Sequence, residues 1–251
     1  MEILRRKPSP YSLPAIPGEG TRGRIAALAA CVALAGAGPA TTRQADVIYA
    51  NDFRHGLADF VIEQEQPTIV RAEGGVLRID APAGITVWLK QKLTGPVVIE
   101  YDATAIKADG PNDRVSDLNC FWMADGPQRD GNLLATPRSG KFADYDTLTT
   151  YYVGYGGNMN TTTRFRRYVG QANHRPLRPG DEFTDADHLL KPNVSVHLKL
   201  VADGGRVEYW RDNERLFAID DPQPYRDGWF GFRTVKSHLE IRNLIIRSPR
   251  E

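Results

Sequence analysis

The sequence predicts an all-β protein, built as a sandwich of two antiparallel sheets. From Asp46 onward, short segments that alternate apolar and polar residues, or are rich in β-branched residues, follow one another along the chain. Gly, Pro, Asp and Asn separate these segments, and no apolar stretch keeps a helical period. About a dozen strands without a strand–helix–strand rhythm favour two packed antiparallel sheets in a single domain of residues 46–251.

Nine predicted strands lie outside the region that we expect to carry the chemistry. Their residue ranges are 76–80, 85–90, 97–106, 114–123, 194–201, 206–211, 216–219, 228–232 and 238–246. The predicted turns between them include Glu73-Gly74-Gly75, Thr94-Gly95-Pro96, Asp203-Gly204-Gly205 and Asp212-Asn213.

Residues 1–45 are predicted to be an export segment and a linker. Arg22 and Arg24 precede an apolar run over residues 25–37, whose small-residue end suits a signal peptidase. The run is too short for a transmembrane helix, so we expect an exported protein, periplasmic or extracellular, with no transmembrane span. Lipid anchoring at Cys31 is an alternative, which the continuation of the apolar run beyond that cysteine disfavours.

The charge balance argues against a nucleic-acid-binding protein. The 32 Lys and Arg residues are matched by 31 acidic residues, and they form no basic blocks. With Cys31 in the export segment, Cys120 has no partner for a disulfide. No Cys or His spacing typical of zinc occurs, so we expect no cofactor, although a structural calcium ion bound by Asp side chains and carbonyls stays open.

Residues 145–168 are predicted to form the hairpin that carries the chemistry. Residues 149–155 are dense in Thr, Tyr and Val, residues 161–168 alternate, and Gly156-Gly157-Asn158 supplies the turn. The side-chain period of two places Arg164 and Arg166 on one face of the second strand. Cations in mid-strand need water or a partner, so a structural network of arginines and carboxylates is the alternative to a functional site.

The residues around these arginines suit an acidic polysaccharide or oligosaccharide as partner. Tyrosine offers a flat apolar face with a polar tip, amides bind hydroxyls in both senses, and arginine forks match a carboxylate. The candidate catalytic residues are Tyr155, Arg164, Arg166, His174 and Asp117. The candidate substrate-binding residues are Asn119, Tyr151, Tyr152, Asn158, Asn160 and Tyr168.

Asp117 and His174 join this set for separate reasons. Around Asp117, alternation turns Leu118 and Cys120 toward the predicted core, so Asp117 and Asn119 point the other way and could face the arginines. A structural Asp–Arg pair is the alternative. His174 lies in a loop just after the arginine strand, where a rigid sheet would present it to a ligand.

Three blocks of this sequence resemble the YesU-like family of bacterial proteins. They are residues 112–124, 228–234 and 237–241. That family is placed in the concanavalin A-like lectin/glucanase superfamily and is associated with gene clusters for polysaccharide degradation. The resemblance implies a jelly-roll fold and a carbohydrate context, but no settled reaction.

Three functions are therefore open. A polysaccharide lyase would use arginine or amide groups to neutralise a uronate carboxylate, with tyrosine or histidine as base and tyrosine as acid, an inventory that resembles known jelly-roll lyases. A glycoside hydrolase needs two carboxylates, and Glu100-Tyr101-Asp102 lacks the third acid of the superfamily's ExDxxE strand. A non-catalytic carbohydrate-binding module also fits the fold. We rank the lyase first and the hydrolase second.

Overall fold

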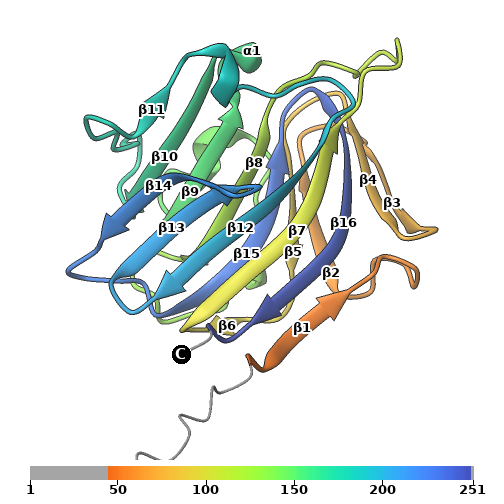
Figure 1. The fold of residues 1–251 in the computed structure, drawn as a ribbon. Coiled ribbons are helices and arrows are strands. Elements are labelled where there is room, and N and C mark those ends of the chain that lie inside the picture. The colour runs from red at the N-terminus through yellow and green to blue at the C-terminus, as the bar shows by residue number, and fades with distance from the viewer. Residues whose placement is uncertain (1–44, 250–251) are drawn as a thin grey trace, which may run out of the picture. The chain divides into compact units, whose positions relative to one another are not determined.

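The computed structural model describes residues 45–249, which form two antiparallel sheets packed face to face (Figure 1). The predicted two-sheet sandwich is confirmed. The export segment predicted for residues 1–45 lies, except for Ala45, outside the described residues. No helix within residues 45–249 is long and apolar enough to cross a membrane.

The two sheets contain sixteen strands between them in the described part of the chain. The order in the first sheet is β14 (Glu214–Asp220), β13 (Arg206–Arg211), β12 (Ser195–Asp203), β7 (Val97–Ala105), β16 (Ser237–Arg247), β4 (Val76–Ala81) and β3 (Ile69–Glu73), and β1 (Val47–Asn51) also pairs with β16. The order in the second sheet is β11 (Glu182–Phe183), β10 (Thr162–Val169), β9 (Thr149–Gly156), β8 (Leu118–Asp125), β15 (Asp227–Thr234), β5 (Ile85–Leu89) and β2 (Phe60–Gln64), and β6 (Leu93–Thr94) pairs with β15.

The main hydrophobic core fills the space between the two sheets. Strand β7 shows the pattern most clearly, because its buried residues alternate with half-buried ones along its whole length. In contrast, every residue of β8 and β9 is buried. The outer face of the second sheet must therefore be covered as well.

A second, aromatic core covers part of that outer face. Trp88, Phe121, Tyr145 and Tyr152 belong to it, and the rings of Phe121 and Tyr145 stack with their centroids 5.4 Å apart. Residues 126–148 cross this face and include the short helices η1 (Leu133–Ala135) and η2 (Phe142–Tyr145); a third, η3 (Ala186–His188), precedes β12. This covering segment leaves a cleft open only over the ends of β8, β9 and β10 that lie toward the turn between β9 and β10.

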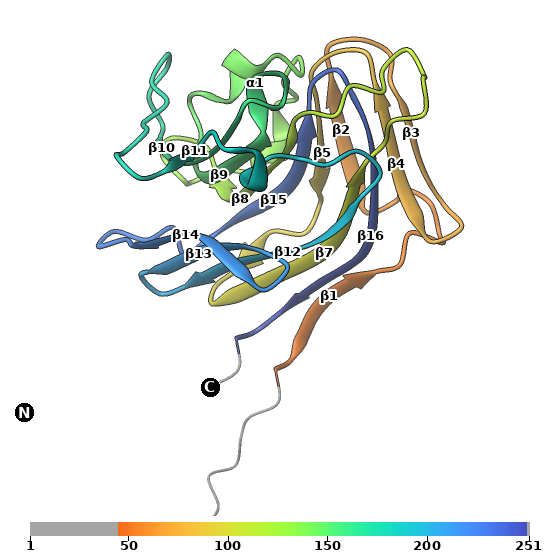
Figure 2. The ribbon, with the colours of Figure 1, turned by 45° about the horizontal axis from the view of Figure 1, so that its top comes forward.

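Strands β9 and β10 form the predicted hairpin, and an unusual left-handed turn joins them (Figure 2). The turn, α1 (Gly157–Asn160), is preceded by Gly156 at φ 64°, and Asn158, Met159 and Asn160 also have φ between 51° and 60°. Asparagine tolerates this conformation better than most residues. The side chain of Asn160 fixes the turn, because it accepts a hydrogen bond from the main-chain N–H of Leu190 and donates one to the Leu190 carbonyl, both at 2.9 Å.

Candidate functional site

Two rows of side chains cross the outer face of the second sheet, because residues of neighbouring strands lie in register. The first row is mainly polar and consists of Glu63, Thr86, Arg233, Asn119, Gly154, Arg164 and Glu182. Each residue of the second row lies two positions from a residue of the first row on the same strand, and this row consists of Val61, Trp88, Gly231, Phe121, Tyr152 and Arg166. Since side chains alternate with a period of two, both rows point to the same face.

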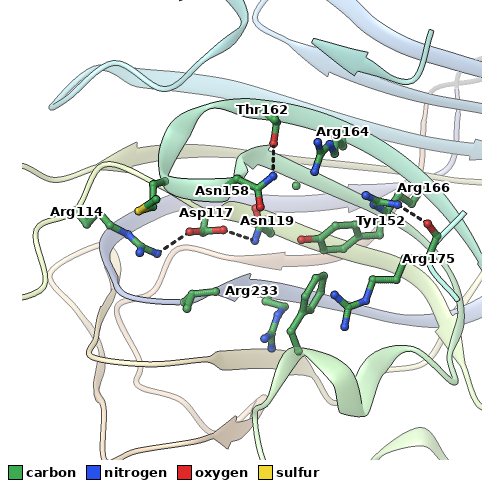
Figure 3. A pocket seen from close by; sticks show the side chains of 15 residues that line it. Arg114, Asp117, Asn119, Tyr152, Asn158, Thr162, Arg164, Arg166, Arg175 and Arg233 are labelled. Carbon is green, nitrogen blue, oxygen red and sulfur yellow. Dashed lines mark hydrogen bonds and ion pairs between the residues drawn. The ribbon is translucent and has the colours of Figure 1, made fainter. Parts of the chain in front are cut away.

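The uncovered ends of these rows line a cleft of about 470 Å³ (Figure 3). Five arginines line it: Arg114, Arg164, Arg166, Arg175 and Arg233. Asp117 is the single carboxylate among the lining residues, which also include Asn119, Tyr152 and Asn158. The cleft is therefore rich in positive charge and in hydrogen-bonding groups.

Three of the five arginines are neutralised by ion pairs. Arg114 contacts Asp117 with a distance of 2.8 Å between Nη2 and Oδ2. The Nε of Arg164 pairs with Glu182, the neighbouring residue in the first row. Arg175 makes a two-pronged contact with Asp146, at 2.5 and 3.1 Å, and its guanidinium lies 4.2 Å from the ring centroid of Phe142.

Arg166 has no carboxylate within 4.0 Å in the part of the chain that the structure describes. It donates hydrogen bonds to the main-chain carbonyls of Arg175 and Pro176 instead. Burial, together with the positive charges of Arg164 and Arg175, lowers the pKa of Arg166 below its usual value, although arginine stays protonated at any physiological pH. An anionic ligand group would relieve this accumulation of charge.

Arg233 is also without a carboxylate partner among residues 45–249, although it is only 1% exposed. Its Nη1 donates to the hydroxyl of Thr86 and to the carbonyl of Gly140, and its Nε is buried with no partner. The guanidinium lies over the ring of Tyr145, 4.6 Å from its centroid. A buried cation without an ion pair is costly, which makes Arg233 a second centre of uncompensated positive charge.

Six of the predicted site residues lie together in the cleft: Asp117, Asn119, Tyr152, Asn158, Arg164 and Arg166. Asp117 accepts hydrogen bonds from Arg114 and from the hydroxyl of Ser116, so it forms the Asp–Arg pair that was the alternative to a catalytic role, but with Arg114 and not with an arginine of the hairpin. The roles of these six residues stay predictions.

Tyr151 and Tyr155 do not reach the cleft, because they lie on the opposite face of β9 from Tyr152 and Gly154. The Tyr151 hydroxyl donates to Asp221 in the interior at 2.7 Å. The Tyr155 hydroxyl lies 3.5 Å from the carbonyl oxygen of Leu189, toward the other sheet. The prediction that Tyr155 and Tyr151 line one site with the arginines is therefore wrong in its geometry.

Three further predicted residues lie outside the cleft lining. His174 is exposed in its loop, and the neighbouring residue, Arg175, enters the cleft in its place. Asn160 holds the turn through Leu190, and Tyr168 lies beneath the cleft, buried against Phe121 and Tyr152.

Glu100 and Asp102 belong to the first sheet and lie on its outer side, where the two carboxylates contact His197 at 3.4 and 2.8 Å. They are therefore not part of the arginine cleft. Nor does any group of three or more His, Cys, Asp or Glu side chains within residues 45–249 have an arrangement that could hold a metal ion.

Sequence reasoning missed Arg233, Arg114, Arg175 and Phe142. A signal was available for Arg233, because Phe230 and Phe232 alternate toward the core and turn Arg233 to the outer face. Arg114 and Arg175 lie in irregular segments and Phe142 begins the short helix η2, so no periodic pattern marks them and only the tertiary structure brings them to the cleft.

Solved structures that resemble this chain share its two-sheet architecture at low sequence identity. A protein of unknown function with a galectin-like fold from Bacillus subtilis superposes with a TM-score of 0.63 and 14% identity, over 82% of this chain and 98% of that one. The carbohydrate-binding module CBM66 from Bacillus subtilis gives 0.51 and 13%, over 76% and 97%. An endo-β-1,3-glucanase from Pyrococcus furiosus gives 0.53 and 9%, over 81% and 94%. These similarities establish the jelly-roll fold.

No curated protein matches the sequence significantly. The comparisons do not confirm the resemblance to the YesU-like family. The family model that matches, over residues 79–244, is described as a domain of unknown function, DUF6250. The match covers β5 to β15 entirely and β4 and β16 in part, and the chain belongs to the DUF6250 family.

Proposed function

We propose that this chain is a carbohydrate-active protein whose cleft binds an acidic saccharide through the carboxylate of a uronate unit. The observation that carries the proposal is the pair of arginines, Arg166 and Arg233, that lack a carboxylate partner among the described residues while lining one cleft. A guanidinium fork matches a carboxylate in geometry and charge, whereas a neutral sugar would leave both charges uncompensated.

Other features are consistent with a sugar ligand. Asn119, Asn158 and Tyr152 supply hydrogen-bonding groups beside the arginines, as hydroxyl-rich ligands require. Two of the similar structures are a carbohydrate-binding module and a glucanase, so the fold is compatible with either binding or cleavage. The export segment predicted at residues 1–45 would bring the protein to polysaccharides outside the cytoplasm.

β-Elimination is the reaction that the lining residues favour, if the bound saccharide is cleaved. A base removes the proton next to the carboxylate, the electron pair forms a carbon–carbon double bond, and the glycosidic oxygen leaves with a proton from an acid. The arginines would stabilise the charge that develops on the carboxylate. Burial raises the pKa of Tyr152 well above its usual value, so its hydroxyl stays protonated and can donate a hydrogen bond to the bound saccharide.

Hydrolysis by two carboxylates fits the cleft less well. That mechanism needs a second acid at about 5–10 Å from the first, and Asp117 is the single carboxylate of the lining. Asp117 is also the lining carboxylate that could take a proton in an elimination, although Arg114 holds it in an ion pair. Binding without turnover is the alternative to the lyase.

Titration calorimetry on the purified protein tests the proposal. The probes are oligosaccharides of galacturonate, glucuronate and mannuronate, each paired with its carboxyl-reduced neutral counterpart. We expect one acidic probe to bind and its neutral counterpart to bind at least about tenfold more weakly. Equal affinity for both, or no binding to any acidic probe, would overturn the proposal.

Turnover is measured on the same probes. Ultraviolet absorbance from an unsaturated product together with new reducing ends indicates a lyase. Reducing ends alone indicate a hydrolase, and neither signal leaves a binding module.

A further inference from the structure

We infer that the cleft recognises one free hydroxyl of the bound sugar unit above Gly154, between the amide oxygen of Asn119 and the hydroxyl of Tyr152. This inference rests on the proposed binding of an acidic saccharide. It adds a requirement that the charge of the cleft does not impose: the ligand must carry an unsubstituted hydroxyl close to its carboxylate.

Gly154 leaves a gap in the polar row of the sheet. It lies between Asn119 of β8 and Arg164 of β10, and it is the row's only residue without a side chain. A Cβ at this position would lie 3.1 Å from the hydroxyl oxygen of Tyr152 and 3.3 Å from its ring. The phenol of Tyr152 therefore leans over Gly154, and any side chain there would displace it.

Asn119 offers an acceptor that no group within residues 45–249 uses. Its side chain is 3% exposed and lines the cleft, and its Oδ1 is buried with no hydrogen-bond partner. The Nδ2 lies 3.5 Å from the Oδ1 of Asp117, and this contact fixes the orientation of the amide, because the reverse orientation would set two oxygens against each other. Buried amide oxygens in native proteins nearly always have a donor, so a ligand donor is the natural partner.

Tyr152 offers the complementary donor. Its hydroxyl points along the cleft toward Asn119 (Figure 3). Because burial holds its pKa well above the usual value, the hydroxyl keeps its proton and can donate to a ligand oxygen. A sugar hydroxyl is both a donor and an acceptor, so it can donate to Asn119 and accept from Tyr152 at the same time.

The arginines place this hydroxyl close to the ligand's carboxylate. Arg164 flanks Gly154 in the first row, and Arg166 lies opposite Tyr152 in the second. Arg164 therefore lies one strand spacing, about 5 Å, from Gly154 along the sheet, and Arg166 lies on the diagonal, about 7–8 Å away. Separations on this scale suit a hydroxyl and a carboxylate of the same sugar ring, so the ligand is a uronate unit with that hydroxyl free.

Three variants test the inference by calorimetry with the acidic oligosaccharide that binds the parent protein. Tyr152→Phe removes only the hydroxyl, and Gly154→Ala fills the gap while keeping a backbone conformation open to alanine. We expect each to raise Kd at least about fivefold. Tyr152→Phe should leave the melting temperature little changed, whereas Gly154→Ala, which displaces the buried ring of Tyr152, should lower it. Gly131→Ala is the matched control, because no atom lies within 4 Å of its added Cβ, and its Kd should equal that of the parent.

A second measurement identifies which ring hydroxyl of the ligand is recognised. Derivatives of the probe are prepared with one ring hydroxyl at a time replaced by hydrogen. One derivative should bind the parent more weakly, and for that derivative Tyr152→Phe should cost no further affinity.

The outcomes separate this inference from the proposal on which it rests. If the parent binds an acidic saccharide but Tyr152→Phe and Gly154→Ala bind it equally well, the hydroxyl requirement is wrong and the proposed function stands. If Gly154→Ala is the only variant that does not fold, the affinities of Tyr152→Phe and of the deoxy derivatives test the inference. If the parent binds none of the acidic probes, both ideas are wrong.

Discussion

Arg166 donates a hydrogen bond to the main-chain carbonyl oxygen of Arg175, so the backbone of one cleft arginine holds the side chain of another. Because this acceptor is neutral, the charge of Arg166 is not compensated. Arg164 differs, because its Nε pairs with the carboxylate of Glu182. The two arginines that strand alternation places on one face are therefore not equivalent, and they should respond differently to the same substitution.

Arg166→Lys should weaken binding of the acidic saccharide more than Arg164→Lys does. Lysine keeps the charge but loses the fork, and a charge-assisted hydrogen bond contributes roughly 1.5–3 kcal/mol, which corresponds to about 10- to 100-fold in Kd. Calorimetry gives the affinities and thermal melting gives the stabilities, with Arg242→Lys, on the other sheet, as control. A large fall in melting temperature with unchanged affinity would mean that the arginines form a structural network.

Glu63→Ala should lower the free energy of unfolding by about 3–5 kcal/mol, because it removes one partner of a buried ion pair. Glu63 accepts hydrogen bonds from Trp88 at 2.9 Å and from Tyr145 at 2.8 Å, and Arg138 lies 3.2 Å away. Urea denaturation measures the loss, and Glu73→Ala, at an exposed position, is the control. A loss no larger than that of the control would show that the network beneath the aromatic core contributes little.

Asp221 should make the protein lose stability in acid. Burial opposes ionisation of this carboxyl, but hydrogen bonds from Arg167 and Tyr151 outweigh burial, and its pKa lies below the usual value. A lowered pKa in the folded state stabilises the protein above the unfolded pKa of about 3.9, and this stabilisation is lost as the pH falls through the folded pKa.

The Asp221→Asn variant tests this linkage. Its unfolding free energy, measured with urea, should be lower than the parent's at neutral pH and should fall less steeply below about pH 5. Two curves that stay parallel across this range would assign the acid sensitivity to other carboxylates.

Substitutions at Asn160 and at Asn158 should affect different properties: the stability of the fold for Asn160 and the affinity for the saccharide for Asn158. Both have left-handed backbones that glycine accepts, so a change to glycine tests chiefly the side chain. Asn160→Gly removes both hydrogen bonds to Leu190 and should lower the unfolding free energy by about 1–3 kcal/mol. Asn158→Gly removes a group that lines the cleft and should act mainly on saccharide affinity. Identical profiles of melting and binding would contradict this division.

Export should remove residues from the N-terminal segment. The basic, apolar and small-residue succession before Asp46 predicts cleavage near Ala35-Gly36-Ala37. Mass spectrometry of protein recovered from the producing cells identifies the N-terminus, and a lipid at Cys31 would appear as added mass. Recovery of the intact chain from the cytoplasm would rule out the export segment.

Strand alternation predicted much of the fold, because local patterns determine which face a residue occupies. Predicted strand 206–211 agrees with β13 at both ends, whereas β8 starts at Leu118 rather than at the predicted Arg114. The difference arises at Asp117, whose φ of 59° ends the extended backbone. The strands β1, β2 and β3 were not predicted, since each has five residues of which at most two are buried, and such a strand carries little periodic signal. The two-residue strands β6 and β11 were not predicted either.

The composition of the site depends on how the strands pair in register, and this pairing cannot be read from the sequence. Alternation placed Arg166 on the face that carries the cleft. Which tyrosine lies beside it, Tyr152 or Tyr155, depends on the pairing within the hairpin, and that pairing sets Tyr152 opposite Arg166. His174 was favoured as a loop residue, although the loop turns Arg175 into the cleft. Tertiary packing, rather than local propensity, decided both outcomes.

The pairing of β1 with β16 has a practical consequence for measuring these affinities. Val47 lies opposite Arg247, and Ser248 donates from its main-chain N–H to the carbonyl of Asp46, so both ends of the folded domain leave from the same edge. In both ribbon views this edge is at the opposite end of the sandwich from α1 (Figures 1 and 2). A fluorophore or an immobilisation tag attached beyond residue 248 would therefore lie far from the turn that borders the cleft. Surface-based binding assays could use a tag at either end of the folded domain.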